Sequence, residues 1–196
     1  MNTKRNMLGL MGGVALSPLL VVGTGPVAAF AAPGPQANYF PNLVLQSHEG
    51  RKLRFYDDVL RGKIVVINMM YTVCTGICPG NTANLLRVQE MLGDRVGRDI
   101  FMVSLTLRPE FDTPRALQAY VTQYGIKPGW TFLTGKPADV EIIRRTLGFF
   151  DSDPATDRDI SQHTGMVRIG NTVRDRWVMT PALASPRQIA RTILEM

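Results

Sequence analysis

The segment "GKIVVINMMYTVCTGICPG" (residues 62–80) decides the fold of this chain. Its first half, 62–70, is a nearly unbroken run of β-branched and other apolar residues, which is typical of a strand buried on both faces of a sheet. Its second half places Cys74 and Cys78, the two cysteines of the chain, in a loop that leads into a helix predicted over about 79–91. A buried strand followed by a loop and a helix indicates an α/β domain.

The rest of the chain continues the alternation of strands and helices. Before the segment, a hairpin is predicted to turn at Glu49-Gly50, and near the end another is predicted to turn at Gly170-Asn171. The remaining predicted elements are a strand at 99–107, a helix at 114–124 capped by Asp112 or Thr113, a strand at 129–135, a helix at 137–147 and a C-terminal helix after Ser185.

This order predicts a thioredoxin-like fold: a mixed sheet flanked by helices, with an N-terminal hairpin and with a C-terminal hairpin plus helix. The same architecture carries redox, peroxidase and metal-delivery functions. The fold class therefore does not decide the chemistry, which must be argued from particular side chains.

Composition narrows the class of protein further. The chain has 196 residues, 45% of them hydrophobic, which is ordinary for one globular domain. Two cysteines are too few for a disulfide scaffold, so packing must hold the fold together. The net charge is +6, but Lys and Arg are scattered along the chain, so we expect no nucleic-acid partner.

Residues 1–31 have the pattern of an export signal, with a basic start, an apolar stretch and a small-x-small cleavage site at 29–31. The alternative is an uncleaved N-terminal membrane anchor, although a spanning helix needs about 20 apolar residues. Both alternatives place the protein outside the cytoplasm, in the periplasm or an equivalent compartment. Residues 32–40 form a Pro/Gly-rich linker, and residues 41–196 form the folded domain.

The cysteine pair is open to three interpretations: a disulfide staple, a redox pair or part of a metal site. At the start of a helix, backbone N–H groups and the helix dipole stabilise a thiolate. A disulfide across so short a loop constrains the unfolded chain little, so a staple would stabilise poorly. Two thiolates favour Cu(I) or Zn(II), and a third ligand is commonly nitrogen or sulfur.

The chain has two histidines that could supply this third ligand. His163 immediately precedes the last hairpin, where a thioredoxin-like sheet brings its loop against the cysteine loop, although a histidine there can also merely cap a turn. His48 lies next to the first hairpin turn and is expected to be solvated. We therefore favour His163, with Cys74 and Cys78, as the metal site.

Three stretches, "GKIVVINMMYTVCTGICP", "FDTPRALQAYVTQYG" and "ISQHTGMVRI", resemble the Sco/SenC family of exported copper-binding proteins over roughly residues 40–196. The resemblance implies a thioredoxin-like fold and copper bound by Cys74, Cys78 and His163. Because the two thiolates are soft ligands, Cu(I) is favoured, with Cu(II) as the alternative. It also implies a role in assembling the dinuclear copper site of cytochrome c oxidase, as copper donor, as thiol reductant of the recipient, or as both.

The chain departs from this family at three places near the site. Thr75-Gly76 stands where the family has Pro-Asp, Arg108-Pro109 where it has Asp-Pro, and Gln162 where it has Asp before the histidine. The site therefore has fewer negative charges. This favours Cu(I) over a divalent ion and makes a disulfide there more oxidising.

Two functions are compatible with these residues. The first is a copper metallochaperone, rather than a turnover enzyme, whose client is a copper protein such as a cytochrome c oxidase subunit. The second is a thiol–disulfide oxidoreductase in which Cys74 attacks a client disulfide and Cys78 resolves the mixed disulfide. A peroxidase, which would use Thr72 and Arg108 around one cysteine, ranks behind both.

Two further groups of residues are candidate metal ligands. Buried methionines of the strands are expected to be core residues, which leaves Met166 and Met179 as the thioethers to test as copper ligands. An acidic stretch lacks the central Gly and closing Glu of an EF-hand and is expected to be a solvated loop. Its acids are Asp151, Asp153, Asp157 and Asp159.

Overall fold

The computed structural model describes residues 36–160 and 165–196 of the chain. The predicted export signal or anchor, 1–31, lies outside the described residues, and so does the first half of the predicted linker. Across the part of the chain that is described, no helix is long and apolar enough to cross a membrane.

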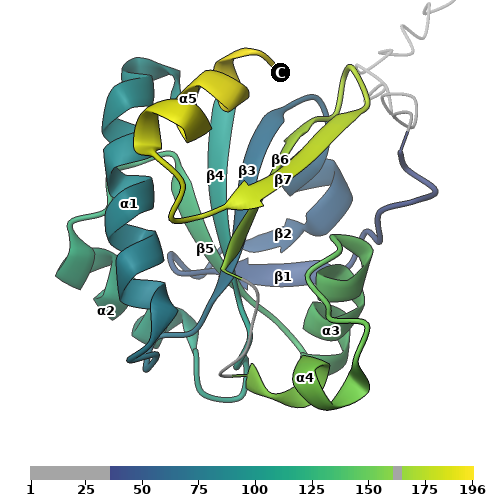
Figure 1. The fold of residues 1–196 in the computed structure, drawn as a ribbon. Helices are drawn as coiled ribbons and strands as arrows, with labels where there is room; N and C mark the ends of the chain where they lie inside the picture. Colours follow the sequence, from purple (N-terminus) through teal and green to yellow (C-terminus); the bar gives the residue numbers. More distant parts are fainter. Residues whose placement is uncertain (1–35, 161–164) are drawn as a thin grey trace, which may run out of the picture. The chain divides into compact units, whose positions relative to one another are not determined.

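The elements follow the predicted alternation (Figure 1). The strands are β1 (Val44–Ser47), β2 (Lys52–Arg54), β3 (Ile64–Met70), β4 (Ile100–Thr106), β5 (Trp130–Thr134), β6 (Met166–Asn171) and β7 (Arg176–Pro181). The helices are α1 (Ile77–Leu92), α2 (Pro114–Tyr124), α3 (Pro137–Thr146), α4 (Pro154–Arg158) and α5 (Pro186–Leu194). A π-helical turn, η1 (Phe55–Leu60), and a 3-10 turn, η2 (Gly93–Arg95), complete them.

The strands form one mixed sheet of seven strands in the order β2-β1-β5-β4-β3-β6-β7. The pairs β3–β4 and β4–β5 are parallel and the others antiparallel, so both hairpins add antiparallel strands to a parallel centre. The first hairpin turns at Glu49-Gly50 as predicted, and Gly50 has a φ of 81°, which a side chain would disfavour. The predicted mixed sheet flanked by helices is confirmed.

Helices cover both faces of this sheet (Figure 1). The first face is covered by α1, α2 and α5, whose apolar sides supply Leu85, Leu117 and Ile189 to one core. The second face is covered by η1 and α3, which supply Leu60 and Ile143 to the other. The fold thus has three layers with a hydrophobic core on each side of the sheet.

Strand β3 is buried on both faces, as its apolar sequence predicts. Val66 and Met70 belong to the core under α1, whereas Val65, Ile67 and Met69 belong to the core under α3. This alternation is the two-residue period of a strand. Because β3 lies between β4 and β6, its carboxyl end, where the cysteine loop begins, is held from both sides.

The C-terminal hairpin forms, but the prediction that it turns at Gly170-Asn171 is wrong. Both residues belong to β6, and the turn spans 172–175. The Asn171 side-chain oxygen accepts a hydrogen bond from the N–H of Val173 (3.0 Å), which starts the turn later than predicted. Gly170 instead allows the Trp177 ring to pack against the backbone of β6, because the ring occupies the space that a β-carbon would need.

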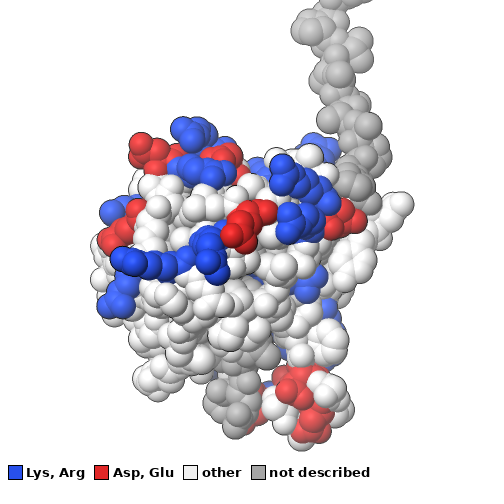
Figure 2. All heavy atoms as spheres, turned by 45° about the horizontal axis from the view of Figure 1, so that its top comes forward, with Lys and Arg blue, Asp and Glu red and all other residues white. Residues whose placement is uncertain are grey.

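Charged side chains of both signs are interspersed on the face shown in Figure 2. Ion pairs within the described chain include Arg95–Asp99 (2.6 Å) and Arg54–Asp57 (3.0 Å). Partly exposed pairs of this kind contribute only about 0–1 kcal/mol each to stability. The two cores, rather than the surface charges, hold the fold.

Candidate metal centre

The cysteine loop connects the carboxyl end of β3 to the start of α1, as predicted. The N–H of Cys74 donates to the carbonyl of Tyr71 (3.2 Å), which turns the chain back as soon as the strand ends. Cys78 lies in the first turn of α1. Neither cysteine is joined in a disulfide, and both are buried, with Cys74 8% and Cys78 2% exposed.

The two thiols are close enough to hydrogen-bond one another, and this makes them unequal. Burial opposes ionisation of Cys74, but hydrogen bonds from the thiol and the backbone N–H of Cys78 outweigh it and lower the pKa of Cys74. Burial, together with the bond to Cys74, raises the pKa of Cys78 to about 12. The pair therefore has one sulfur that ionises more readily, on Cys74, and one that stays protonated at neutral pH, on Cys78.

Tyr71 is a further partner of Cys74 that the sequence analysis did not identify. Its hydroxyl hydrogen-bonds the Cys74 thiol, which lowers the pKa of Cys74 and raises the pKa of Tyr71 to about 12. The Arg108 guanidinium lies 4.3 Å from the centre of the Phe111 ring and 6.0 Å from that of Tyr71. A cation thus borders the cysteine loop.

Asp112 has a role that its sequence did not reveal. Of the two expected caps of α2, Thr113 is the cap, accepting from the N–H of Ala116 at 3.2 Å, which confirms that prediction. Asp112 is fully buried and accepts hydrogen bonds from the N–H and hydroxyl of Thr72 and from the hydroxyl of Thr106. The Thr72 hydroxyl donates to this carboxylate, not to a cysteine, which disfavours the peroxidase interpretation.

His163 and Gln162 lie outside the described residues, but the chain resumes close to the cysteines. Gly165 packs on the first turns of α1, where a β-carbon would meet the Ile77 side chain at 2.4 Å and Asn81 Nδ2 at 3.7 Å. Antiparallel pairing of β3 with β6 brings the carboxyl end of β3 and the start of β6 to the same edge of the sheet. Among the described residues there is no group of three or more His, Cys, Asp or Glu side chains placed to hold a metal.

The other candidate ligands do not join the cysteines. His48 Nδ1 accepts a hydrogen bond from the N–H of Phe132 in β5 (3.1 Å). The ring was expected to be solvated, but it is half-buried and bound to this strand. Burial lowers the pKa of His48. Met166 and Met179 pack against the core under α3, whereas the cysteines belong to the core on the opposite face.

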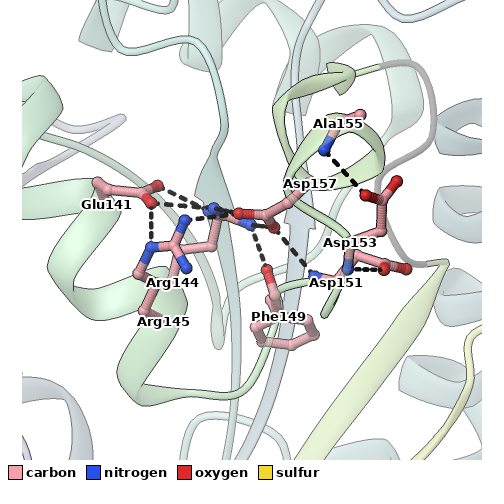
Figure 3. Close-up of polar contacts among 8 residues, drawn as sticks. All are labelled: Glu141, Arg144, Arg145, Phe149, Asp151, Asp153, Ala155 and Asp157. Atoms are coloured by element: carbon pink, nitrogen blue, oxygen red, sulfur yellow. Dashed lines mark hydrogen bonds and ion pairs between the residues drawn. The ribbon is translucent and has the colours of Figure 1, made fainter.

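The acidic stretch is only in part the predicted solvated loop: Asp151, Asp153 and Asp159 are exposed, but the side chain of Asp157 is buried (Figure 3). Part of it forms α4, which Asp153 caps by accepting from the N–H of Thr156 at 3.0 Å. Asp157 is only 4% exposed and pairs with Arg144 (2.8 Å) and Arg145 (2.6 Å) of α3. Hydrogen bonds from Arg144, opposed by burial, hold the pKa of Asp157 far below its usual range.

Comparison with known proteins places these features in a family. The family model described as SCO1/SenC matches residues 33–196. A curated relative, a SCO1 protein homolog of Bacillus subtilis, is 29% identical over 94 residues, which are 47% of this chain and 47% of the relative. The matched stretch thus spans about half the length of that relative.

Two solved structures have the same fold. ScoI of Bradyrhizobium japonicum with copper bound superimposes with a TM-score of 0.62 at 22% identity, over 78% of this chain and 95% of that one. BsSco, described as having a disulfide switch and as a member of the Sco family of cytochrome c oxidase assembly proteins, gives 0.62 at 20% identity, over 78% and 90%. From the family model, which covers most of its length, this chain belongs to the SCO1/SenC family.

Proposed function

We propose that this protein is a copper metallochaperone that holds Cu(I) through Cys74 and Cys78 and helps to assemble a copper site in an exported or membrane-bound oxidase. The observation that carries the proposal is the pair of buried thiols, not joined in a disulfide, that hydrogen-bond one another at the start of α1. Two thiolates held this close are a soft donor set, which suits Cu(I) better than a hard divalent ion.

His163 is the proposed third ligand. It lies two residues before Gly165, which packs on Ile77 and Asn81 in the first turns of α1. The described chain thus lies beside the start of α1 only two residues after His163 in sequence, which supports His163 as the third ligand. An imidazole nitrogen and two thiolates would complete a trigonal site for Cu(I).

The client and the compartment follow from the family and from the N-terminal sequence. Relatives include a structure with copper bound and a protein described as belonging to cytochrome c oxidase assembly proteins, so the proposed client is a copper-binding subunit of such an oxidase. Residues 1–31 would export the chain or anchor it in a membrane. The copper would leave by ligand exchange, with the recipient's sulfurs replacing those of this protein in turn.

An anaerobic titration of the reduced chain with Cu(I), against a competing chelator, tests the proposal. We expect one equivalent to bind tightly in the wild-type protein. Cys78→Ser should abolish tight binding, and His163→Ala should weaken it by at least about tenfold. His48→Ala is the matched control, since that ring bonds only the edge of β5 among its described contacts, and its affinity should equal that of the wild type.

A result in which no copper binds in competition with the chelator would remove the metallochaperone function. Equal affinities for His163→Ala and His48→Ala would remove His163 from the site and leave a two-sulfur centre.

A second candidate, thiol–disulfide exchange, is favoured by the inequality of the two thiols, since the pKa of Cys74 is lowered by hydrogen bonds and that of Cys78 is raised by burial. The Cys74 thiolate would attack a client disulfide, forming a mixed disulfide and releasing one client thiolate, which takes up a proton. The Cys78 thiol would lose its proton and attack the Cys74 sulfur, releasing the second client thiol. The client gains two electrons and this protein ends with a Cys74–Cys78 disulfide.

Trapping with an oxidised dithiol peptide distinguishes the two functions. If exchange is the activity, Cys78→Ser should accumulate a mixed disulfide on Cys74, while Cys74→Ser should not. His163→Ala should then exchange at the wild-type rate, because no step of the exchange uses the histidine. Failure of Cys78→Ser to form the adduct would count against this activity.

A further inference from the structure

Exposed apolar side chains from three loops border the cysteine pair. Val73, inside the cysteine loop, is 64% exposed, and Phe111, in the loop between β4 and α2, is 62% exposed. Leu183, in the loop between β7 and α5, is also exposed and lies beside the first turn of α1, where a β-carbon at Gly80 would meet it at 3.5 Å. Apolar side chains gathered at one place on a surface are typical of a contact site for another molecule.

The loops that carry Val73 and Phe111 are fixed to one another. The carboxylate of Asp112 accepts a hydrogen bond from the N–H of Thr72 at 3.2 Å, and each of these residues is next in sequence to one of the exposed apolar residues. The N–H groups of Phe111 and Asp112 both donate to the carbonyl of Arg108 at 2.9 Å, which closes the second loop into a turn. The two loops therefore form one preorganised surface, which we call the rim and define as Val73, Arg108 and Phe111.

Arg108 gives the rim a positive charge that has no ion-pair partner in this chain. Its guanidinium lies over the Phe111 ring, 4.3 Å from the ring centre, and 6.0 Å from the centre of the Tyr71 ring. None of the ion pairs among the described residues includes Arg108 or its sequence neighbour Glu110. The segments outside the described residues, 1–35 and 161–164, contain no Asp or Glu. The charge is therefore available to a carboxylate of another molecule.

The rim lies next to the sulfur that a partner must reach. Cys74 and Cys78 are both buried, so a partner sulfur that exchanges with them has to come into direct contact with the cysteine loop. The Tyr71 hydroxyl bonds the Cys74 thiol, and the Tyr71 ring borders the Arg108 guanidinium. A partner that reaches Cys74 therefore passes beside Arg108 and Val73.

We propose that the rim is the docking surface for the client, and that the client presents a carboxylate and apolar side chains beside its own metal-binding sulfurs. The carboxylate would pair with Arg108, and the apolar side chains would cover Val73 and Phe111. Arginine and aromatic residues are enriched among the side chains that contribute most to binding at protein interfaces. This inference rests on the proposed function, because it takes the partner to be the protein that receives copper from Cys74 and Cys78.

Charge decides which kind of partner fits the rim. A basic surface would be repelled by Arg108, and a purely apolar surface would bury the guanidinium without a counterion, which is costly. A surface that is acidic and apolar avoids both penalties. A guanidinium that lies over a ring keeps its N–H donors at its edge, where a carboxylate can accept from them.

Three synthetic peptides test the proposal without copper. Each contains one cysteine, activated as a mixed disulfide with thionitrobenzoate, beside the same two leucines, and the three differ in one neighbouring residue: Glu, Gln or Lys. In the chain carrying Cys78→Ser, the Cys74 thiolate attacks the peptide sulfur, forms a protein–peptide disulfide and releases thionitrobenzoate, whose absorbance gives the rate. We expect the Glu peptide to react about two- to fivefold faster than the Gln peptide, and the Lys peptide to be the slowest.

Variants of Arg108 assign this preference to the rim. In the Cys78→Ser background, Arg108→Gln should make the three rates equal, and Arg108→Glu should invert their order, so that the Lys peptide reacts fastest. Because the peptides are compared on the same variant, a change in the reactivity of Cys74 itself cancels. Arg87→Gln, which removes an exposed arginine farther along α1, is the matched control and should keep the original ratio of rates.

Phe111→Ala tests the apolar part of the rim. It should slow all three peptides by at least about twofold, because each carries the same leucines. Val173→Ala is the control, since this exposed side chain lies in the turn of the last hairpin, at the other end of the sheet from the cysteine loop, and its rates should be unchanged.

Two results would overturn the inference while leaving the proposed function intact: equal rates for the Glu and Gln peptides when Arg108 is present, or a preference for Glu that survives Arg108→Gln. Failure of the proposed function is recognised separately, by the Cu(I) titration, because the peptide reaction uses no copper.

Discussion

The buried carboxylate of Asp112 accepts hydrogen bonds from both the N–H and the hydroxyl of Thr72, 40 residues earlier in the chain. Thr72 stands two residues before Cys74, so this contact fixes the start of the cysteine loop against the loop that follows β4. The hydroxyl of Thr106, the last residue of β4, completes the set of donors. A buried charge is tolerated here because three donors surround it.

Asp112→Asn should destabilise the protein by about 2 kcal/mol, because an amide has one acceptor oxygen in place of two and brings donors of its own. Urea unfolding followed by circular dichroism measures the change as a lower midpoint with an unchanged slope. Glu110→Gln neutralises an exposed acid of the same loop and should leave the midpoint within error. Equal midpoints for both variants would show that the carboxylate of Asp112 does not anchor the loop.

Tyr71→Phe should slow the alkylation of Cys74 by iodoacetamide at pH 7. The Tyr71 hydroxyl lowers the pKa of Cys74, so its removal raises that pKa and leaves less of the reactive thiolate. Mass spectrometry of digested, partly alkylated protein gives the rate at each cysteine. In the wild type Cys78 should react far more slowly than Cys74, since its pKa is raised to about 12 and its side chain is buried.

The control for Tyr71→Phe is Tyr39→Phe, which removes an exposed hydroxyl that bonds the carbonyl of Thr146. Its alkylation rates should equal those of the wild type. If Cys74 reacts as fast in Tyr71→Phe as in the wild type, the hydroxyl does not act on the thiol.

The apolar pattern of the chain was sufficient to predict the order of the elements and the burial of β3 on both faces. Residues 64–70 have no polar position except Asn68, and a strand with that pattern has few places in a fold except the centre of a sheet. The start of α1 at the cysteine loop could be predicted for the same reason, because a helix must follow to cover the strand.

Contacts between acids and distant donors could not be predicted in this way. Asp112 and Asp157 both appear in the sequence as polar residues of a loop or cap. Their partners Thr72 and Arg144 lie 40 and 13 residues away, and no period of the sequence connects them. The turn of the last hairpin was predicted at the wrong residues for a similar reason. Gly170 is required because the Trp177 ring of the next strand packs against it, not because the chain turns there.

Gly170→Ala should therefore destabilise the protein by about 1–3 kcal/mol through overpacking. A β-carbon at this position would lie 2.2 Å from the ring of Trp177 in β7, so the ring would have to move away from Gly170. Thermal unfolding measures the loss. Gly80→Ala is the control within α1, where a β-carbon meets only Leu183 at 3.5 Å and the helix should gain up to about 1 kcal/mol. Equal shifts for the two variants would contradict this account of the hairpin.

The ion pair between Asp157 and Arg144 predicts how stability depends on pH. Because hydrogen bonds from Arg144 hold the pKa of Asp157 far below its usual range, the folded state keeps this carboxylate charged where the unfolded chain, with an ordinary pKa near 3.9, takes up a proton. The stabilisation is therefore complete above about pH 5 and is lost as the pH falls through 4 and below. Asp157→Asn lacks this contribution, so its urea midpoint should be lower at pH 7 and should fall less between pH 7 and pH 3 than that of the wild type. Asp94→Asn, which neutralises an exposed acid after α1, should follow the wild-type curve. Parallel curves for Asp157→Asn and the wild type would show that the Asp157 carboxylate does not stabilise the fold through its charge.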